Sequence, residues 1–235
     1  MPTITALKVQ TRNKDRVNVY LDGEFAFGLA KIEAIRLRLG QSLTAEDIAR
    51  LRQADTFEWA YETALKFLSY RPRSEAEVRQ YFNQKERKKK KEAEQKGEDD
   101  SRALDESVVG AVIERLRRAG LVNDAGFAQF WVENRTAFRP KGKRALQAEM
   151  RAKGLPTSAI EAALVNADDT AVAGQLAAAR ARRLKDLPEP EFRRKLSDYL
   201  ARRGIGYDVI AEAVERAWRE RGGEDGLSSP SEAAG

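Results

Sequence analysis

The sequence contains no cysteine and no histidine. The chain therefore cannot form a disulfide, and it cannot build a zinc site from thiolate or imidazole ligands. A cysteine nucleophile and a histidine general base are excluded as well. No P-loop signature occurs, and the pair Gly204 and Gly206 is followed by Val209 where a dinucleotide fingerprint needs a third glycine. We expect a protein that is not an enzyme and that uses no cofactor or metal.

Long apolar runs are also missing. No stretch approaches the ~18 uninterrupted apolar residues that a membrane span needs, and the first residues, MPTITALKVQ, lack the features of a signal peptide. We expect a cytoplasmic protein with no membrane contact. The 235-residue chain has a formal net charge of +6, which favours acidic partners such as nucleic acid.

Alternating apolar residues predict strands in the first 30 residues, in the stretches ITALKVQ, RVNVYL and EFAFGL. The dipeptide Asp22-Gly23 between the second and third stretch is a strong hairpin signal. We expect a small β-hairpin region that caps the helices that follow.

Helix signals begin directly after these strands. A short helix is predicted near residues 31–38, ended by Gly40, and Thr44 with Asp47 comes close to a capping box for another. Asp55 has the character of an N-cap for a longer helix that runs to about residue 70. From there on, the apolar spacing is helical throughout.

The helical part repeats. Residues 139–164 align with residues 189–214 at an offset of 50 without a gap, and in each an apolar helix ends at a glycine before a second short helix begins. A third copy precedes them: Pro72 corresponds to Pro140 at an offset of 68. The later part of this copy aligns at an offset of 51, which indicates an insert of 17 residues.

The insert is the segment 87–103, RKKKKEAEQKGEDDSRA, with seven basic and five acidic side chains and no aromatic residue. Such a segment cannot bury enough apolar surface to fold by itself. We expect either a solvated loop or a prolongation of the flanking helices.

These patterns predict a mainly α chain, in which tandem three-helix repeats form an elongated curved array behind the N-terminal β-hairpin region. A unit of about 50 residues buries little surface alone, so we expect neighbouring repeats to complete one another's cores. The predicted divisions are an N-terminal region (1–54), repeat 1 (55–122), repeat 2 (123–167), repeat 3 (168–221) and a disordered tail (222–235).

Basic residues recur at the corner between the first and second helix of each repeat. A proline in a corner and a capping box of Ser74 with Glu77 are sufficient for an ordinary helix connection. Cations at the start of a helix, however, oppose the helix dipole. We therefore hypothesise a basic edge that serves as a binding surface. Its members are Arg71, Arg73, Arg139, Lys141, Lys143, Arg144, Arg193 and Arg194.

Two stretches of the first repeat are specific: AYETALKFLSYRPRSEAEVRQYF and IERLRRAGLVNDAGFAQFWVENR. Through them, and over about residues 15–220, the chain resembles the RecX family, regulators of the RecA recombinase. The residues that match the family's corner and its Gly-Leu junction are Arg71, Arg73, Ser74, Glu77, Val78, Gly120, Leu121, Asn123, Asp124, Phe127 and Ala128.

The resemblance implies a cytoplasmic, non-enzymatic protein made of three three-helix repeats. It implies a partner, the RecA filament on single-stranded DNA, whose extension, ATPase, strand exchange and coprotease activity the protein inhibits in recombination and DNA repair. Contact with the DNA would be direct or through RecA, and we expect a monomer. The alternative is a DNA-binding repressor of helix-turn-helix type that acts without RecA, because such helix pairs look alike in sequence.

Overall fold

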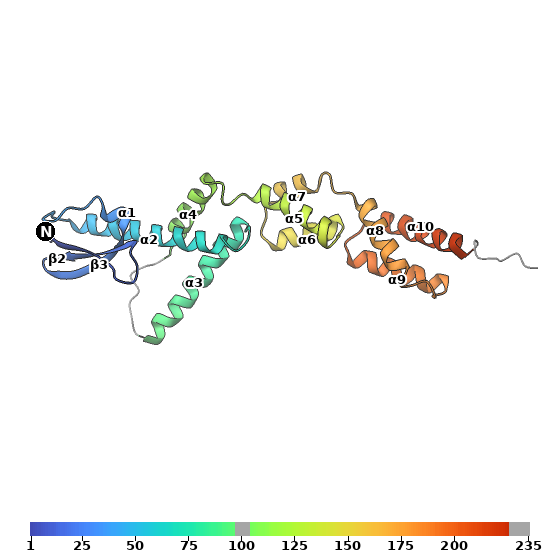
Figure 1. Cartoon of the computed structure of the whole chain (residues 1–235), viewed down its shortest axis with the longest axis horizontal. Helices are drawn as coiled ribbons and strands as arrows, with labels where there is room; N and C mark the ends of the chain where they lie inside the picture. The colour runs from blue at the N-terminus through green and yellow to red at the C-terminus, as the bar shows by residue number, and fades with distance from the viewer. Residues whose placement is uncertain (97–103, 226–235) are drawn as a thin grey trace, which may run out of the picture. The chain divides into compact units, whose positions relative to one another are not determined.

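The computed structural model describes residues 1–96 and 104–225. They form two compact units that divide between residues 123 and 124, and they are mainly helical, with three-helix repeats and a small N-terminal sheet, as predicted (Figure 1). The elements of unit 1 are β1 (Ile4–Val9), β2 (Arg16–Leu21), β3 (Glu24–Ala30), α1 (Lys31–Ala34), α2 (Ala45–Leu68), α3 (Glu75–Lys96) and α4 (Glu106–Arg118). Those of unit 2 are α5 (Asp124–Phe138), α6 (Lys143–Ala152), α7 (Thr157–Leu164), α8 (Asp169–Ala181), α9 (Glu189–Arg202) and α10 (Tyr207–Asp225).

The three N-terminal strands form one antiparallel sheet in the order β1-β2-β3. Alternate residues of β2, namely Val17, Val19 and Leu21, face the local core. Asp22 and Gly23 connect β2 to β3, and both have positive φ, at 50° and 94°. A type I′ hairpin turn requires this at its two central positions, so the Asp-Gly signal is confirmed.

The helix predicted over residues 31–38 is shorter than expected and ends at Ala34. The chain beyond it turns toward β1 instead. The amide of Leu37 donates to the carbonyl of Ala34, and Gly40, in the left-handed region at φ 80°, donates to the carbonyl of Ile4 at 2.8 Å. Pairing with the sheet therefore replaces further helical turns.

The capping box is confirmed, because Thr44 and Asp47 exchange hydrogen bonds at the start of α2. The prediction that Asp55 caps a separate helix is wrong, since α2 runs without a break from Ala45 to Leu68. Asp55 is 3% exposed. Its carboxylate accepts from the Ala30 amide at 2.9 Å and pairs with Arg16 at 2.8 Å. It therefore joins the sheet to α2.

Each repeat has a hydrophobic cluster of its own. Equivalent positions are buried in repeats 2 and 3, such as Leu146 with Leu196 and Met150 with Leu200. The two clusters are nevertheless separate, which differs from the expected shared core. Within residues 124–225, each set of three helices encloses its own apolar side chains.

Two glycines end the central helices of repeats 2 and 3. Gly154 and Gly204 have φ of 72° and 81°. The next residue in each case, Leu155 or Ile205, donates back to the carbonyl five residues earlier, at 3.2 and 3.3 Å. This is the Schellman arrangement that a glycine at C′ permits. The glycine repeat in the sequence therefore marks two equivalent helix ends.

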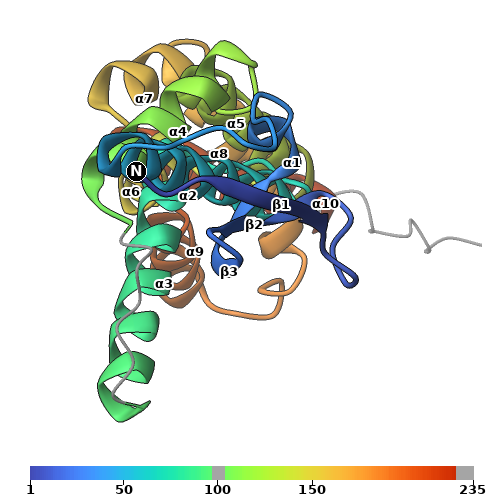
Figure 2. The ribbon, with the colours of Figure 1, turned by 90° about the vertical axis from the view of Figure 1, so that its left-hand side faces the viewer.

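The insert begins as helix. α3 continues to Lys96, ten residues into the predicted insert of 87–103, and residues 97–103 lie outside the described part. None of the side chains described between residues 87 and 93 is buried. In both views the end of α3 stands clear of α2 and of the sheet (Figures 1 and 2).

At the C-terminal end of unit 2, α10 continues to Asp225. The first four residues of the predicted tail of 222–235 are thus helical, and residues 226–235 lie outside the described part of the chain.

We expect that residues 87–103 can be replaced by a short Gly-Ser linker with little loss of stability. The residues that flank the segment already meet, since the Leu104 amide donates to the Glu86 carboxylate at 3.4 Å. The melting temperature should fall by no more than about 2–4 °C, which corresponds to ~1 kcal/mol in a protein of this size. Phe82→Ala, which removes a buried side chain of the same helix, should lower it far more. A fall of more than about 8 °C on deletion would contradict the expectation.

Candidate interaction surface at the helix corners

The corner of repeat 1 is built around a capping box. Ser74 Oγ accepts from the Glu77 amide at 3.2 Å, and the Glu77 carboxylate accepts from the Ser74 amide at 3.4 Å. The same carboxylate holds Arg71 in a bidentate pair at 2.9 and 3.0 Å. Arg71 is therefore committed to the start of α3, where Glu77 offsets its charge.

The second cation of this corner lies on aromatic side chains. The guanidinium of Arg73 lies 4.1 Å from the ring centre of Phe67, which stacks in turn on Tyr81 at 4.1 Å. Burial lowers the pKa of Arg73, and repulsion from Arg71 lowers it further. Its Nε atom is buried, and the described residues offer it no hydrogen-bond acceptor. Arg73 is thus a packing residue of this corner.

Glu149 of α6 is the centre of the corner in repeat 2. Its carboxylate accepts from Trp131 Nε1 at 2.9 Å, from Arg135 Nε at 2.8 Å and from Lys141 Nζ. Burial raises the pKa of Glu149, but the hydrogen bonds from Arg135, Lys141 and Trp131 outweigh it, so the pKa lies below the ordinary glutamate value. Lys141 therefore serves the fold by joining the corner to α6.

The start of α6 is stabilised by a carboxylate from the next repeat. Gly142 is the N-cap and has no side chain to accept a hydrogen bond. Asp169, at the start of α8, accepts from the Lys143 amide at 2.8 Å. A negative charge at a helix N-terminus opposes the effect of the two cations there, Lys143 and Arg144.

Of the two predicted cations on α9, one is held by carboxylates and the other is exposed. Arg193 donates to Glu189 at 2.7 Å and lies 2.8 Å from Glu215 of α10. Arg194, the next residue, is exposed. Among the described residues, no carboxylate lies within ion-pair distance of Arg194.

Two of the cations in repeat 2 are exposed and uncommitted. Arg139 follows α5 and Arg144 lies in the first turn of α6, and both are exposed to solvent. No ion pair from either side chain is formed with the residues that the structure describes. The eight predicted cations therefore include four that are held within the fold, three that are exposed, and Lys143, which is half-buried.

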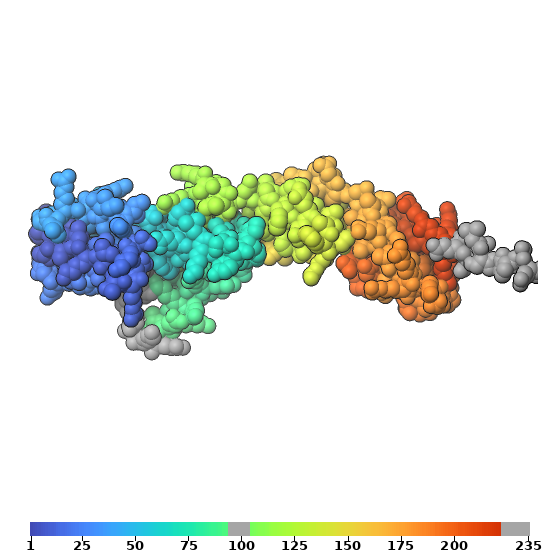
Figure 3. Space-filling model, viewed as in Figure 1, coloured from blue at the N-terminus to red at the C-terminus, as the bar shows by residue number. Residues whose placement is uncertain are grey.

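The repeat 2 corner contacts repeat 3 at the C-terminal end of α9. This end lies roughly 15 Å from Arg193 along the helix, at a rise of ~1.5 Å per residue. The Gly142 amide donates to the carbonyl of Arg203 at 2.9 Å, and the Arg203 guanidinium donates to the carbonyl of Pro140 at 3.5 Å. The atoms of the two repeats touch in the space-filling view (Figure 3). Arg203 thus adds a cation to this corner. Sequence reasoning missed it, because an arginine at a helix C-terminus already has an explanation in the helix dipole.

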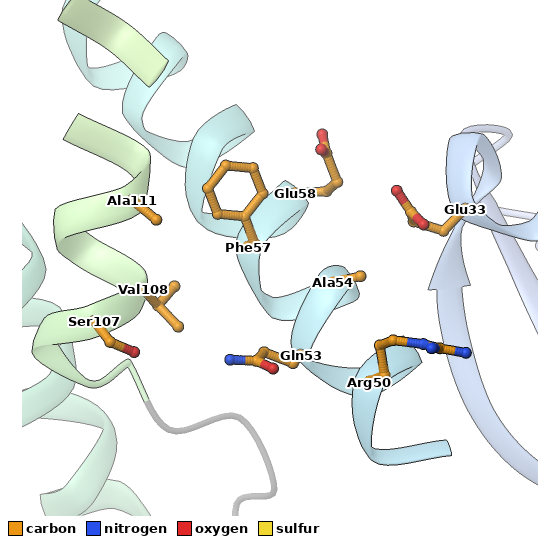
Figure 4. Close-up of a pocket in the computed structure, with 9 residues that line it drawn as sticks. All are labelled: Glu33, Arg50, Gln53, Ala54, Phe57, Glu58, Ser107, Val108 and Ala111. Atoms are coloured by element: carbon orange, nitrogen blue, oxygen red, sulfur yellow. The ribbon is translucent and has the colours of Figure 1, made fainter. Parts of the chain in front are cut away.

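Unit 1 also has an open pocket of about 300 Å³ between α1, α2 and α4 (Figure 4). Apolar side chains such as Phe57 and Val108 line it, with Glu58 and Arg50 beside them. Glu58 is bound by Arg115 at 2.6 Å. In the part of the chain that the structure describes, no group of acidic side chains could hold a metal ion. Nor is any helix of that part long and apolar enough to cross a membrane.

The models of four RecX domains match the chain in order. They are the RecX N-terminal domain at residues 2–43 and the first, second and third three-helix domains at residues 60–86, 123–164 and 167–214. The match to the first three-helix domain ends at residue 86, directly before the insert.

Relatives with the description "Regulatory protein RecX" align with most of the chain. The one from Bacillus subtilis (strain 168) is 29% identical over 221 residues, which are 92% of this chain and 77% of that protein. The one from Oceanobacillus iheyensis is 35% identical over 171 residues, 70% of this chain and 57% of that protein. A solved structure, described as "Crystal structure of regulatory protein RecX", is similar with a TM-score of 0.72 and 26% identity, over 92% of this chain and 100% of that one.

We expect Gly204→Ala to destabilise unit 2 more than Gly120→Ala destabilises unit 1. Both glycines have positive φ, at 81° and 68°, so both substitutions carry a left-handed penalty of roughly 1–2 kcal/mol. Only at Gly204 would the new methyl group meet backbone, at 2.4 Å from the Ala145 nitrogen, whereas at Gly120 nothing lies within 4 Å. Urea unfolding of the two variants measures the difference. Equal reductions in stability would show that the corner tolerates the methyl group.

Glu149→Gln should lower the free energy of unfolding at pH 7 by about 1–3 kcal/mol, because it weakens three hydrogen bonds from the fold. The folded-state pKa of Glu149 is lowered, so its contribution is present above the unfolded-state pKa and is lost as the pH falls through the folded-state pKa. The variant and the wild type should therefore converge in stability at acid pH. Glu161→Gln, at an exposed glutamate of α7, is the control and should have no such effect. A gap that stays constant as the pH falls through the folded-state pKa would contradict the assignment.

Proposed function

This chain belongs to the RecX family of regulatory proteins, and we propose that it binds the RecA filament on single-stranded DNA and inhibits RecA. The inhibited activities are filament extension, ATP hydrolysis, strand exchange and coprotease action, so that the protein modulates recombination and DNA repair. It acts without catalysis of its own, as a monomer in the cytoplasm.

The exposed cations of the repeat 2 corner carry this proposal. Arg139 and Arg144 are exposed and uncommitted within the described residues, whereas Lys141 beside them is used by the fold. The Asp169 carboxylate that caps α6 is bound to a backbone amide. The corner therefore presents guanidinium groups without an adjacent free acid, which suits an anionic partner.

A RecA–DNA filament offers two kinds of anion to such a surface. Phosphates of the DNA bind guanidinium groups in bidentate fashion, and so do carboxylates on the surface of a protein. We propose that Arg139, Arg144 and Arg194 bind these anions, with Lys143 and Arg203 adding positive charge nearby. Arg71, Arg73, Lys141 and Arg193 position the corners from within the fold.

The test of the proposed function is RecA ATPase on single-stranded DNA, titrated with this protein. We expect inhibition that saturates. A repressor of helix-turn-helix type would instead protect one duplex sequence in a footprint with RecA absent, and would leave the ATPase unchanged. That pair of results would overturn the proposal.

The double variant Arg139→Glu/Arg144→Glu should need at least about a hundredfold more protein for half-maximal inhibition, because each of the two charge-assisted hydrogen bonds contributes roughly 1.5–3 kcal/mol and ~1.4 kcal/mol is a factor of ten. The variant Arg151→Glu/Arg216→Glu is the matched control. It makes the same change in net charge at two exposed cations of unit 2 that lie outside the corners. Circular dichroism should show both variants folded.

Salt dependence separates the two kinds of anion. If phosphates are bound, the salt slope of DNA binding should fall by about 0.7 for each phosphate that the variant no longer neutralises. If RecA carboxylates are bound, inhibition should fall while binding to naked DNA stays the same. A folded corner variant that inhibits at the wild-type concentration would contradict the assignment of these residues.

A further inference from the structure

Two aromatic residues occupy equivalent positions directly before the corners and are used by neither core. Tyr70 and Phe138 lie 68 residues apart, which is the offset that relates repeat 1 to repeat 2. Their side chains are 74% and 77% exposed. Each ring stands at the C-terminal end of the first helix of its repeat, just beyond α2 or as the last residue of α5.

The fold does not explain this exposure. Other rings of the same helices are packed: Phe67 stacks on Tyr81, and Phe127 on Trp131. Tyr70 and Phe138 belong to no hydrophobic cluster and form no ring contact within the described residues. A large ring left in water at one position is common, but its recurrence at the same position of two repeats suggests use.

The surroundings of the rings are cationic. Each is followed by an arginine, a proline and a second cation, in the sequences Tyr-Arg-Pro-Arg and Phe-Arg-Pro-Lys. In repeat 2 the arginine next to the ring, Arg139, is exposed and forms no ion pair with the residues that the structure describes. In repeat 1 the corresponding Arg71 is held by Glu77. The corner of repeat 2 therefore combines an exposed ring with an exposed arginine, whereas the two arginines next to the ring in repeat 1 are held within the fold.

We propose that Tyr70 and Phe138 stack on unpaired bases of single-stranded nucleic acid, while Arg139 beside Phe138 binds its phosphates. Base and phosphate alternate along a single strand, and a ring beside a cation matches that alternation. In a duplex the base faces are covered by their neighbours, so an isolated exposed ring has no face to stack on. This inference deepens the proposed function and rests on its contact with single-stranded DNA.

The test compares two oligonucleotides of equal length, oligothymidine and its abasic counterpart, which has the same phosphates and no bases. Binding is followed by fluorescence anisotropy in the absence of RecA. Wild-type protein should bind oligothymidine more tightly. The variant Tyr70→Ala/Phe138→Ala should bind it at least about thirtyfold more weakly, since each base stacked on an aromatic side chain adds at least about fivefold to the affinity. Its affinity for the abasic strand should not change.

Two controls keep the result specific. The swap Tyr70→Phe/Phe138→Tyr retains both rings and should retain the preference for bases. Tyr207→Ala removes a ring that is 84% exposed but whose counterpart in repeat 2 is Thr157, and it should have no effect. The alanine variant should also keep the salt slope of the wild type, because it removes no cation.

Three outcomes would overturn the inference. First, if the wild-type protein binds both strands equally, or does not bind oligothymidine, no base stacking takes place. An alanine variant that keeps the wild-type preference shows that the rings are not the stacking surface. A variant that binds DNA normally but no longer inhibits the RecA ATPase places the rings on RecA itself, and leaves the proposed function intact.

The proposed function can also fail on its own. If wild-type protein leaves the RecA ATPase unchanged while its preference for bases depends on Tyr70 and Phe138, the base-stacking surface stands and the regulation of RecA does not.

Discussion

Cation–carboxylate pairing at the start of a helix is the interaction on which the corners of this protein depend. A helix N-terminus repels positive charge, yet every repeat brings lysine or arginine there. The structure resolves the conflict with carboxylates: Glu77 holds Arg71, Glu149 holds Lys141, and Glu189 holds Arg193. These pairs determine which cations belong to the fold and which are available to a partner.

This division of the cations could not be predicted from the sequence. The sequence identifies the corners, because proline, glycine and the repeat offset are local signals, and it identifies the capping pairs Thr44–Asp47 and Ser74–Glu77 for the same reason. It treats all corner cations alike. The partner of Lys141 lies eight residues along the chain and that of Arg193 on α10 lies 22 residues along, so only the packed structure separates them from Arg139 and Arg144.

The same limit explains the larger errors. Asp55 has the composition of an N-cap, but its use is set by Arg16 and Ala30 of the sheet, which reach it from another part of the chain. The helix predicted after β3 is shortened by pairing with β1. The three-helix repeats, by contrast, were predictable, because the spacing of Leu146, Met150 and their counterparts in repeat 3 reflects packing within one repeat.

The separate clusters of repeats 2 and 3 have a consequence for how the chain tolerates change. Because the two repeats share few buried side chains, the free energy of unfolding of each depends little on the other. Local opening of one repeat therefore need not open its neighbour. Among the described residues, the hydrogen bonds that join them all use backbone atoms of repeat 2: the amides of Gly142 and Lys143 donate to Arg203 and Asp169, and the carbonyl of Pro140 accepts from Arg203. Side chains inside one repeat can therefore diverge without a matching change in its neighbour, provided that Asp169 and the two glycines at the joint are kept. Such a chain is free to evolve one module at a time.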